Sequence, residues 1–229
     1  MLACVLLMTD RPDLADAAEA YARQRFDLRH VSRHARSQRT FPDAAADLID
    51  RGGIDVLLNY LAPMIIPGRV LRGLRQDAIN MHPAPPAWPG IGSASYALYH
   101  GDRTFGVTAH RMTTQIDGGE IVRVTRFPVH PDDTCESLFE RALDATLPVF
   151  YSVCDELSRT GSVSASGDRW ERPAISRAEF ERWMILKPTD SPDEIARKVR
   201  ALAHSRFPGP FFDVDGVRVP VAPTQARHE

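Results

Sequence analysis

The sequence predicts an α/β protein with a Rossmann-like, mostly parallel sheet, and two patterns carry that prediction. The segments 2–8 and 54–60 are continuous apolar runs of strand length, which are typical of strands buried on both faces. Segments with helical spacing of apolar residues alternate with these runs, and this alternation favours a parallel sheet covered by helices. In such sheets, ligands bind beyond the carboxyl ends of the strands.

Local signals support the individual elements along the chain. Pro12 suits the first turn of a helix, Gly52 ends another, and Ser93 can cap a third. Thr134 with Ser137 is a weak capping signal before a long amphipathic helix. The predicted strands cover 2–8, 28–31, 54–60, 77–81, 105–111 and 120–129. The predicted helices cover 12–22, 43–50, 93–100, 134–157, 176–183 and 191–204.

The chain is expected to divide into two unequal parts. A stretch of small polar residues over 161–172 follows the long helix. We therefore expect a main domain over 1–170 and a small C-terminal subdomain over 171–229 that holds short helices and a hairpin. The hairpin signal is the Asp215-Gly216 pair, which lies between two short apolar runs.

Length and composition describe one soluble domain with a small appendage. The 229 residues are 43% hydrophobic and 25% charged, with a formal net charge of −2. This balance gives no field that would recruit nucleic acid or an anionic membrane. The three cysteines are odd in number and widely spaced, which argues against a disulfide framework and favours a cytoplasmic protein. No apolar run reaches the roughly 20 residues that a membrane span needs.

Proline is unusually abundant, and its distribution marks a candidate site. Six of the 18 prolines fall between Pro63 and Pro89, and Asn80 and His82 lie among them. If a strand ends at this point, alternation places both side chains on one face of the sheet. The prolines that follow His82 restrict the backbone. The sequence therefore predicts a rigid site that holds an amide and an imidazole at a strand end.

Further motifs follow this pair in a fixed order. After Asn80-Met81-His82-Pro83 come Gly90, Tyr96-Ala97-Leu98, Gly101, Gly106-Val107-Thr108-Ala109-His110 and Asp117-Gly118-Gly119-Glu120-Ile121. This order resembles the formyltransferases that use 10-formyltetrahydrofolate, whose core runs N-x-H-P, a proline/glycine loop, G-V-T-x-H and D-x-G-x-I. The resemblance is strong over 54–127 and covers the rest of the chain in outline. It implies the formyltransferase fold, with 1–170 as the catalytic core.

The resemblance implies catalytic roles for Asn80, His82 and Asp117. Formyl transfer from a folate nitrogen to an amine passes through a tetrahedral state with an oxyanion, to which the Asn80 amide can donate a hydrogen bond. His82 is either a general base for the amine or an imidazolium that stabilises the oxyanion, and the sequence does not decide between them. Asp117 would orient His82 and favour its charged form. His110 matches a family position that we interpret as structural support.

The same resemblance implies 10-formyltetrahydrofolate as co-substrate and no metal. Its pteridine is expected near 60–67 and 116–119, mostly on backbone groups. Met64, Ile65 and Ile66 would form an apolar wall, although ordinary core packing explains them equally well. His100, His110 and His130 include none of the short-spaced pairs that are usual in a zinc site. The expected cofactor-binding residues are Tyr60, Met64, Ile65, Ile66, Ile116, Gly118 and Gly119.

Features that the sequence lacks narrow the choice of acceptor amine. Methionyl-tRNA formyltransferases add a C-terminal barrel and a basic surface for tRNA, but only about 60 residues follow Gly167 here. Glycinamide ribonucleotide formyltransferases carry a glycine-rich phosphate loop after the first strand, where this chain has Thr9-Asp10-Arg11-Pro12. The chain is therefore most similar to the sugar N-formyltransferases, which formylate nucleotide-linked (dTDP- or similar) amino sugars and are often dimeric.

We expect a nucleotide sugar as the amine substrate, and no nucleic acid or membrane partner. The alternatives are a small amine in siderophore or antibiotic biosynthesis, and a non-catalytic folate-binding protein. The arginines between Arg23 and Arg39 could meet a diphosphate, although all basic residues except two are arginine, which favours a solvated face. The edge of the C-terminal hairpin is a candidate homodimer surface. Weaker candidates for substrate contact are Pro85, Trp88, Tyr96 and Phe105.

Overall fold

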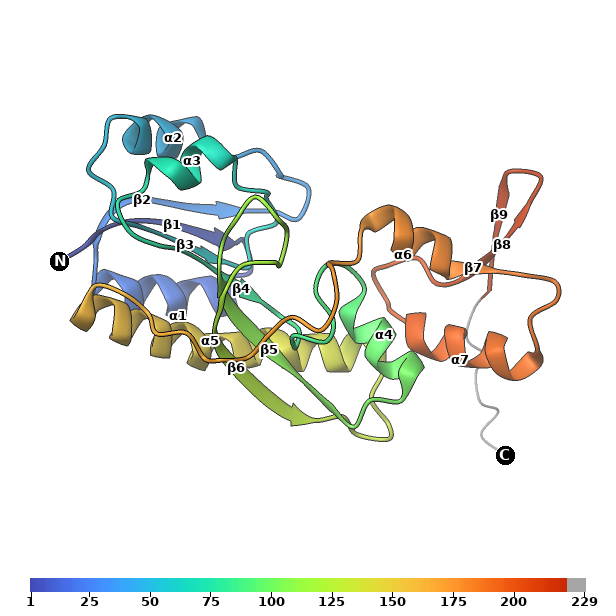
Figure 1. Cartoon of the computed structure of the whole chain (residues 1–229). Helices are drawn as coiled ribbons and strands as arrows, with labels where there is room; N and C mark the ends of the chain where they lie inside the picture. The colour runs from blue at the N-terminus through green and yellow to red at the C-terminus, as the bar shows by residue number, and fades with distance from the viewer. Residues whose placement is uncertain (222–229) are drawn as a thin grey trace.

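The computed structural model describes residues 1–221, and its main feature is a six-stranded sheet (Figure 1). Its strands are β1 (Ala3–Thr9), β2 (Asp27–His34), β3 (Val56–Tyr60), β4 (Ala78–His82), β5 (Thr104–Arg111) and β6 (Ile121–Pro128). The spatial order is β2-β1-β3-β4-β5-β6. β1 to β4 are parallel, whereas β5 and β6 run antiparallel to their neighbours. The predicted Rossmann-like, mostly parallel sheet is confirmed.

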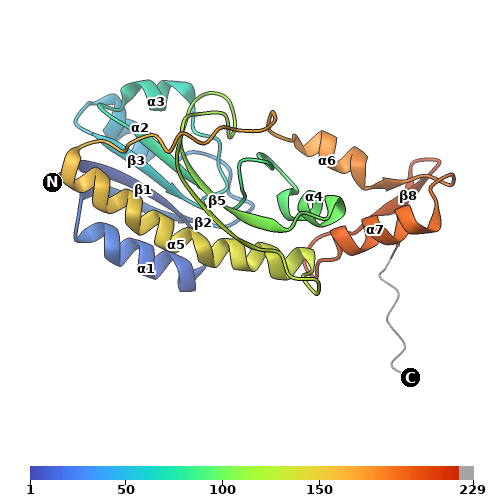
Figure 2. The same ribbon diagram turned by 60° about the horizontal axis from the view of Figure 1, so that its bottom comes forward.

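Helices cover both faces of this sheet. α1 and α5 lie side by side on one face, and α2 and α3 lie on the other (Figures 1 and 2); their bounds are α1 (Pro12–Arg23), α2 (Asp43–Asp50), α3 (Gly68–Gly73) and α5 (Cys135–Thr160). The apolar run of β1 serves both layers. Leu6 is buried in the core with α1 and α5, whereas Leu7 is buried in the core with α2 and α3. Burial on both faces explains why this strand has no polar alternation.

Helix starts agree only partly with the sequence-based prediction. Thr134 and Ser137 form a complete capping box at the start of α5, so the weak signal is confirmed. The prediction that Ser93 caps its helix is wrong, because α4 (Ser93–His100) begins after Gly92 and no side chain caps it. Gly92 has a φ of 79°, which a glycine adopts without strain.

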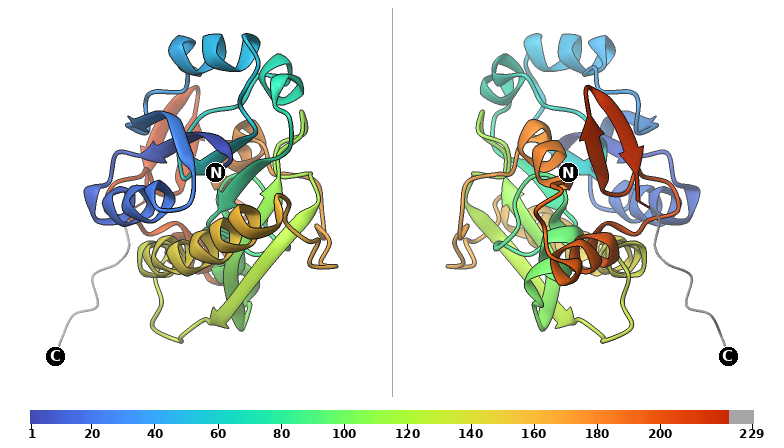
Figure 3. Two further views of the ribbon diagram at one scale, coloured as in Figure 1. Left: turned by 90° about the vertical axis from the view of Figure 1, so that its left-hand side faces the viewer. Right: turned by 90° about the vertical axis from the view of Figure 1, so that its right-hand side faces the viewer.

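The C-terminal part contains two helices and a small sheet, α6 (Arg177–Met184), β7 (Ile185–Leu186), α7 (Pro192–Leu202), β8 (Phe211–Val214) and β9 (Val217–Pro220). The predicted hairpin is present as β8 and β9, and Figure 3 shows it at the opposite end of the molecule from the N-terminus. Asp215 and Gly216 both have positive φ, 51° and 81°, as a two-residue type I′ turn requires. Met184, Leu202 and Phe211 form a separate apolar cluster beneath it.

The segment over 163–175 ties α5 to α6 and braces the proline-rich loop. It runs back along the molecule from the end of α5 (Figures 1 and 2). Its backbone bonds to the loop at three points: Glu171 N–H to the Pro86 carbonyl at 3.1 Å, Ile175 N–H to Pro89 at 2.9 Å, and Ile91 N–H to Ile175 at 3.0 Å. The loop that follows His82 is therefore held by hydrogen bonds as well as by its prolines.

Three further findings concern residues 1–221. All three cysteines are free and buried, as the sequence predicted. Within this range no helix has the length and apolar character to cross a bilayer. The same residues contain no cluster of three side chains suited to hold a metal ion.

Candidate active site

Asn80 belongs to a row of polar side chains that crosses three adjacent strands. The sheet register pairs Asn59 of β3 with Asn80 of β4, and Asn80 with His110 of β5. His82 lies two residues beyond Asn80 on β4, so its side chain projects from the same face. The row therefore gathers two amides and two imidazoles near the carboxyl end of β4.

The orientation of the Asn80 amide follows from its neighbours. The Ala62 N–H donates to Asn59 Oδ1 at 3.1 Å, so the Asn59 Nδ2 group is the one that faces Asn80. That group donates to Asn80 Oδ1 at 2.9 Å, which leaves the Asn80 Nδ2 group as a donor on the opposite side. Nδ2 lies 3.0 Å from His110 Nε2, and its second N–H is left for an acceptor in the cleft.

Both ring nitrogens of His82 face acceptor oxygens. Nδ1 lies 3.4 Å from Asp117 Oδ2, and Nε2 lies 3.1 Å from the Trp88 carbonyl oxygen. A neutral imidazole carries one N–H and satisfies only one of these acceptors, whereas an imidazolium satisfies both.

Asp117 is a buried carboxylate in a strained turn. Its φ is 41°, in the left-handed region that is uncommon for residues other than glycine, and its side chain is 10% exposed. The Gly90 N–H donates to Oδ2 at 2.9 Å, and His110 Nε2 lies 3.2 Å from Oδ1. Burial raises the pKa of the carboxyl, but His82, His110 and the Gly90 N–H outweigh burial and hold that pKa well below its usual range.

Two residues beyond the expected triad shape this site. His110 donates from Nδ1 to the Arg111 carbonyl at 2.9 Å, while its Nε2 faces both Asn80 and Asp117. Trp170 packs edge-on against His82 and His110, with ring centroids 5.9 and 5.2 Å away, and its Nε1–H donates to the Gly119 carbonyl at 2.7 Å. The sequence-based prediction did not include Trp170. In the sequence, Trp170 stands out only as the sole aromatic residue of the polar stretch 161–172.

The expected folate-binding residues divide into exposed and buried groups. Ile65 is 70% exposed and Ile116 is 53% exposed, and a Cβ added to Gly68 would lie 3.1 Å from Thr114, so their two loops are neighbours. Met64, Ile66 and Tyr60 are instead buried in the core, and the Tyr60 hydroxyl accepts a hydrogen bond from Thr146. The Met64 and Ile66 side chains therefore pack in the core with α2 and α3, which agrees with the alternative of ordinary core packing.

Of the two loop glycines, Gly119 fits a close backbone approach. A Cβ at Gly119 would lie 1.9 Å from the Arg111 carbonyl oxygen, so no side chain fits there. Gly118 is less constrained, since an added Cβ would meet the flexible side chain of Gln115 at 2.6 Å.

The four weaker substrate candidates are buried, and none of them lines the cleft at Asn80. Tyr96 stacks between Trp88 and Trp183, with centroids 5.5 and 4.4 Å away, and Phe105 is fully buried. Pro85 lines a separate cavity beside Trp88. Stacking and burial already occupy the surfaces of these side chains, which favours ordinary core packing for them.

A cleft of about 530 Å³ opens at the carboxyl ends of the parallel strands, where α/β sheets bind ligands. The ends of β1, β2, β3 and β4 all contribute to its wall, which includes Asn80 and His82. Its volume is in the range of pockets that hold small-molecule ligands. The further lining residues relevant to charge are Asp10, Arg11, His34, Arg36, Arg39, Arg177 and Arg206.

The arginine run predicted from the sequence separates into two groups. The arginines from 23 to 33 pair with surface carboxylates of α1, β2 and α5. Arg36 and Arg39 instead line the cleft together with Arg177, and within residues 1–221 no carboxylate forms an ion pair with these three. Burial lowers the pKa of Arg36, and the like charges of Arg177, Arg39 and Arg206 lower it further. This group of solvent-exposed cations without carboxylate partners favours an anionic ligand.

Comparisons with known proteins agree with this geometry. A family model described as formyl transferase matches residues 2–154. A curated methionyl-tRNA formyltransferase from Anaplasma marginale is 30% identical over 178 residues, which cover 77% of this chain and 56% of that relative. The chain thus spans about half the length of the first curated relatives that it matches.

Solved structures with the same fold include two N-formyltransferases. A 4-N formyltransferase from Francisella tularensis has a TM-score of 0.75 at 16% identity and covers 96% of both chains. An N-formyltransferase from Helicobacter canadensis, in a complex with folinic acid and dTDP-3-aminofucose, has a TM-score of 0.67 at 15% identity and covers 95% of this chain and 86% of that one. With the family model matching most of its length, this chain belongs to the formyl transferase family.

Proposed function

We propose that the chain transfers the formyl group of 10-formyltetrahydrofolate to the primary amine of a nucleotide-linked amino sugar. The observation that carries this proposal is one cleft that joins Asn80 and His82 to the unpaired cations Arg36, Arg39 and Arg177. The first pair suits formyl transfer, and the arginines suit the phosphates of an anionic acceptor.

Asn80 and His82 can stabilise the oxyanion that forms at the transferred carbon. Asn80 offers the N–H that its neighbours do not use. His82 lies at the cleft wall, and as an imidazolium it can supply a second, charged donor by giving up the Trp88 carbonyl. Donors fixed in advance at such positions are worth several kcal/mol in acyl transfer, about 3–4 for one donor.

Asp117 and His82 can also handle the proton that the reaction moves. The attacking amine loses one proton, and the folate nitrogen that leaves gains one. Asp117 stays ionised and lies 3.4 Å from His82, so it stabilises the charged imidazole. The imidazolium can give a proton to the leaving folate nitrogen and regain one from the attacking amine, directly or through water. In this account His82 acts as an imidazolium, one of the two roles that the sequence left open.

The folate is assigned to the exposed apolar residues beside the triad. Ile65 and Ile116 present apolar side chains to solvent on neighbouring loops, and Gly119 keeps that loop close to β5. Such an exposed apolar pair fits an aromatic ring system, and the backbone of 61–63 and 116–119 would hold its polar edges. The co-substrate supplies the activated formyl group, and the residues of this chain hold that group next to Asn80 and His82.

The test compares two classes of amine at saturating 10-formyltetrahydrofolate. Nucleotide-linked amino sugars form the first panel, and hydroxyornithine-like amines of siderophore and antibiotic chemistry form the second. We expect turnover with at least one member of the first panel and at most trace turnover with the second. Turnover confined to the second panel would reject the sugar assignment, and folate binding without turnover of any amine would reject an enzymatic role.

A further inference from the structure

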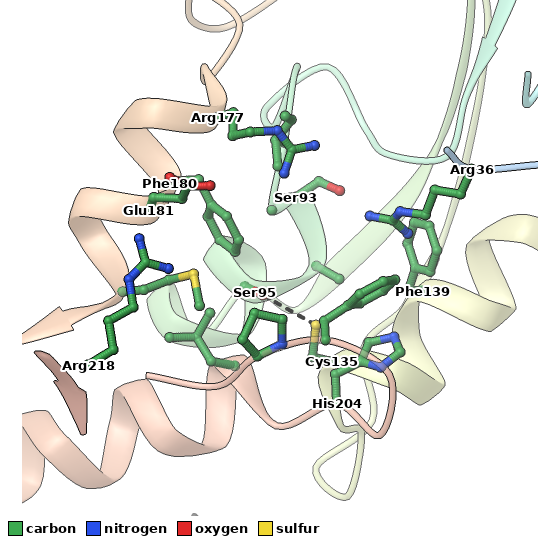
Figure 4. Close-up of a pocket in the computed structure, with 17 residues that line it drawn as sticks. Arg36, Ser93, Ser95, Cys135, Phe139, Arg177, Phe180, Glu181, His204 and Arg218 are labelled. Carbon is green, nitrogen blue, oxygen red and sulfur yellow. Dashed lines mark hydrogen bonds between the residues drawn. The ribbon is translucent and has the colours of Figure 1, made fainter. Parts of the chain in front are cut away.

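A second pocket lies next to the cleft, where α4 and the start of α5 meet the C-terminal part of the chain. It has a volume of about 180 Å³ and is enclosed by α4, the start of α5, α6 and the segment after α7 (Figure 4). Its walls are mainly apolar, with Phe139 on one side and Phe180 on the other (Figure 4), and Phe207 lines it as well. Drug-sized ligands occupy pockets of about 300–1,000 Å³, so this one suits a single ring rather than a whole nucleotide.

This pocket is continuous with the catalytic cleft. Arg36, Ser93, Phe139, Arg177 and Phe207 line both cavities. The guanidinium carbon of Arg36 lies 4.0 Å from the centroid of the Phe207 ring, so a cation–π contact stands where the two cavities meet. An extended ligand with its amine at Asn80 would therefore pass the arginines before its far end reaches this pocket.

One polar group on the pocket wall lacks a partner. The His204 side chain is 3% exposed, and its Nε2 is the one buried side-chain nitrogen or oxygen of residues 1–221 without a hydrogen-bond partner. Nδ1 accepts from the Arg206 N–H at 3.1 Å, which is closer than the Glu136 carboxylate at 3.8 Å. Because Nδ1 accepts, the ring proton lies on Nε2, and burial lowers the pKa of His204 toward this neutral form. A buried N–H without an acceptor destabilises the fold unless a ligand supplies one.

We propose, resting on the function proposed above, that this pocket binds the base of the nucleotide-linked acceptor. Phe139, Phe180 and Phe207 enclose the planar ring, and an acceptor atom of the ring takes the His204 Nε2–H after a small movement of either group. The phosphates then lie against Arg36 and Arg177. The pocket thus selects for a heterocycle of one-ring size, so that the nucleoside contributes affinity separately from the diphosphate.

The test measures binding of dTDP, UDP and GDP to the full chain by calorimetry, with inorganic pyrophosphate as the probe of the arginines alone. We expect a pyrimidine nucleotide to bind more tightly than pyrophosphate. Phe180→Ala and His204→Phe should each weaken that binding about threefold to tenfold and leave pyrophosphate binding unchanged. Arg177→Ala should weaken both. His130→Phe is the matched control, because His130 is exposed and lies outside both cavities.

Each outcome decides the inference, and circular dichroism with thermal melting verifies that every variant folds. Binding of no nucleoside diphosphate, or equal binding to wild type and both pocket variants, would overturn it. The measurement requires neither folate nor amine. Nucleotide binding without turnover would therefore count against the proposed function alone, whereas turnover with unaffected pocket variants would count against the pocket alone.

Discussion

Replacing Asp117 by asparagine removes the one negative charge that both site histidines face, while the side chain keeps its shape. His82 Nδ1 lies 3.4 Å from Oδ2, and the two side chains are 9% and 10% exposed. At that separation and an effective dielectric constant of about 20, a unit ion pair is worth about 5 kcal/mol. Asparagine still offers an acceptor oxygen, so part of the contact survives. We therefore expect kcat to fall about 10²–10³-fold, or roughly 3–4 kcal/mol.

The assay is formyl transfer from 10-formyltetrahydrofolate to the amine that the wild-type protein turns over best, with kcat and KM measured separately. KM should change little, because Asp117 lies behind His82 and does not line the cleft. Asp132→Asn is the control, since Asp132 is an exposed aspartate of a loop distant from the cleft lining. A folded Asp117→Asn protein with kcat within about threefold of wild type would refute the reasoning about the His82 charge.

The remaining predictions concern the oxyanion donor, the bracing tryptophan, acid stability and the helix cap. Asn80→Ala should lower kcat about 10²–10³-fold in the same assay, and an unchanged kcat would remove Asn80 from the chemistry. Trp170→Phe keeps an aromatic ring but loses the hydrogen bond to the Gly119 carbonyl, so kcat should fall about threefold to tenfold. If thermal stability falls while kcat does not, the role of Trp170 is structural. Because the pKa of Asp117 is depressed, the ionised carboxylate stabilises the fold above the ordinary pKa of 3.8, and this stabilisation is lost as pH falls. The free energy of unfolding of the wild type should therefore exceed that of Asp117→Asn by less as the solution is acidified. A difference that stays constant with pH in denaturant titrations would contradict this. Thr134→Ala removes the α5 cap and should cost about 1 kcal/mol, seen as a Tm lower by about 2–4 °C, whereas an unchanged Tm would show that the cap adds nothing.

Strand prediction succeeded where burial leaves a simple pattern. β1 and β3 are buried on both faces, and their sequences are accordingly continuous apolar runs. The hairpin turn at Asp215-Gly216 was also predictable, because few residues tolerate its backbone angles. By contrast, α3 and β7 were not predicted, since elements of six and two residues are too short to show a period.

Predictions about individual side chains were less successful, because a short apolar segment does not show which of its residues face the core. Ile65 is exposed while its neighbours Met64 and Ile66 are buried, although all three are apolar. Trp88, Tyr96 and Trp183 stack on one another, and partners so distant in the chain leave no local signal. The sequence marks Trp170 as the sole aromatic residue of its polar stretch, but it does not show that the ring packs against His82.

The sequence by itself determined the sheet, the placement of Asn80 and His82 at a strand end, and the family motifs. These depend on local properties: hydrophobic period, alternation along a strand, and the φ limits of proline and glycine. Only the tertiary structure decided which charges stay uncompensated. It paired the arginines from 23 to 33 with surface carboxylates and left Arg36, Arg39 and Arg177 facing one cleft. Electrostatic energy depends on distance and burial in space, and neither can be derived from spacing along the chain.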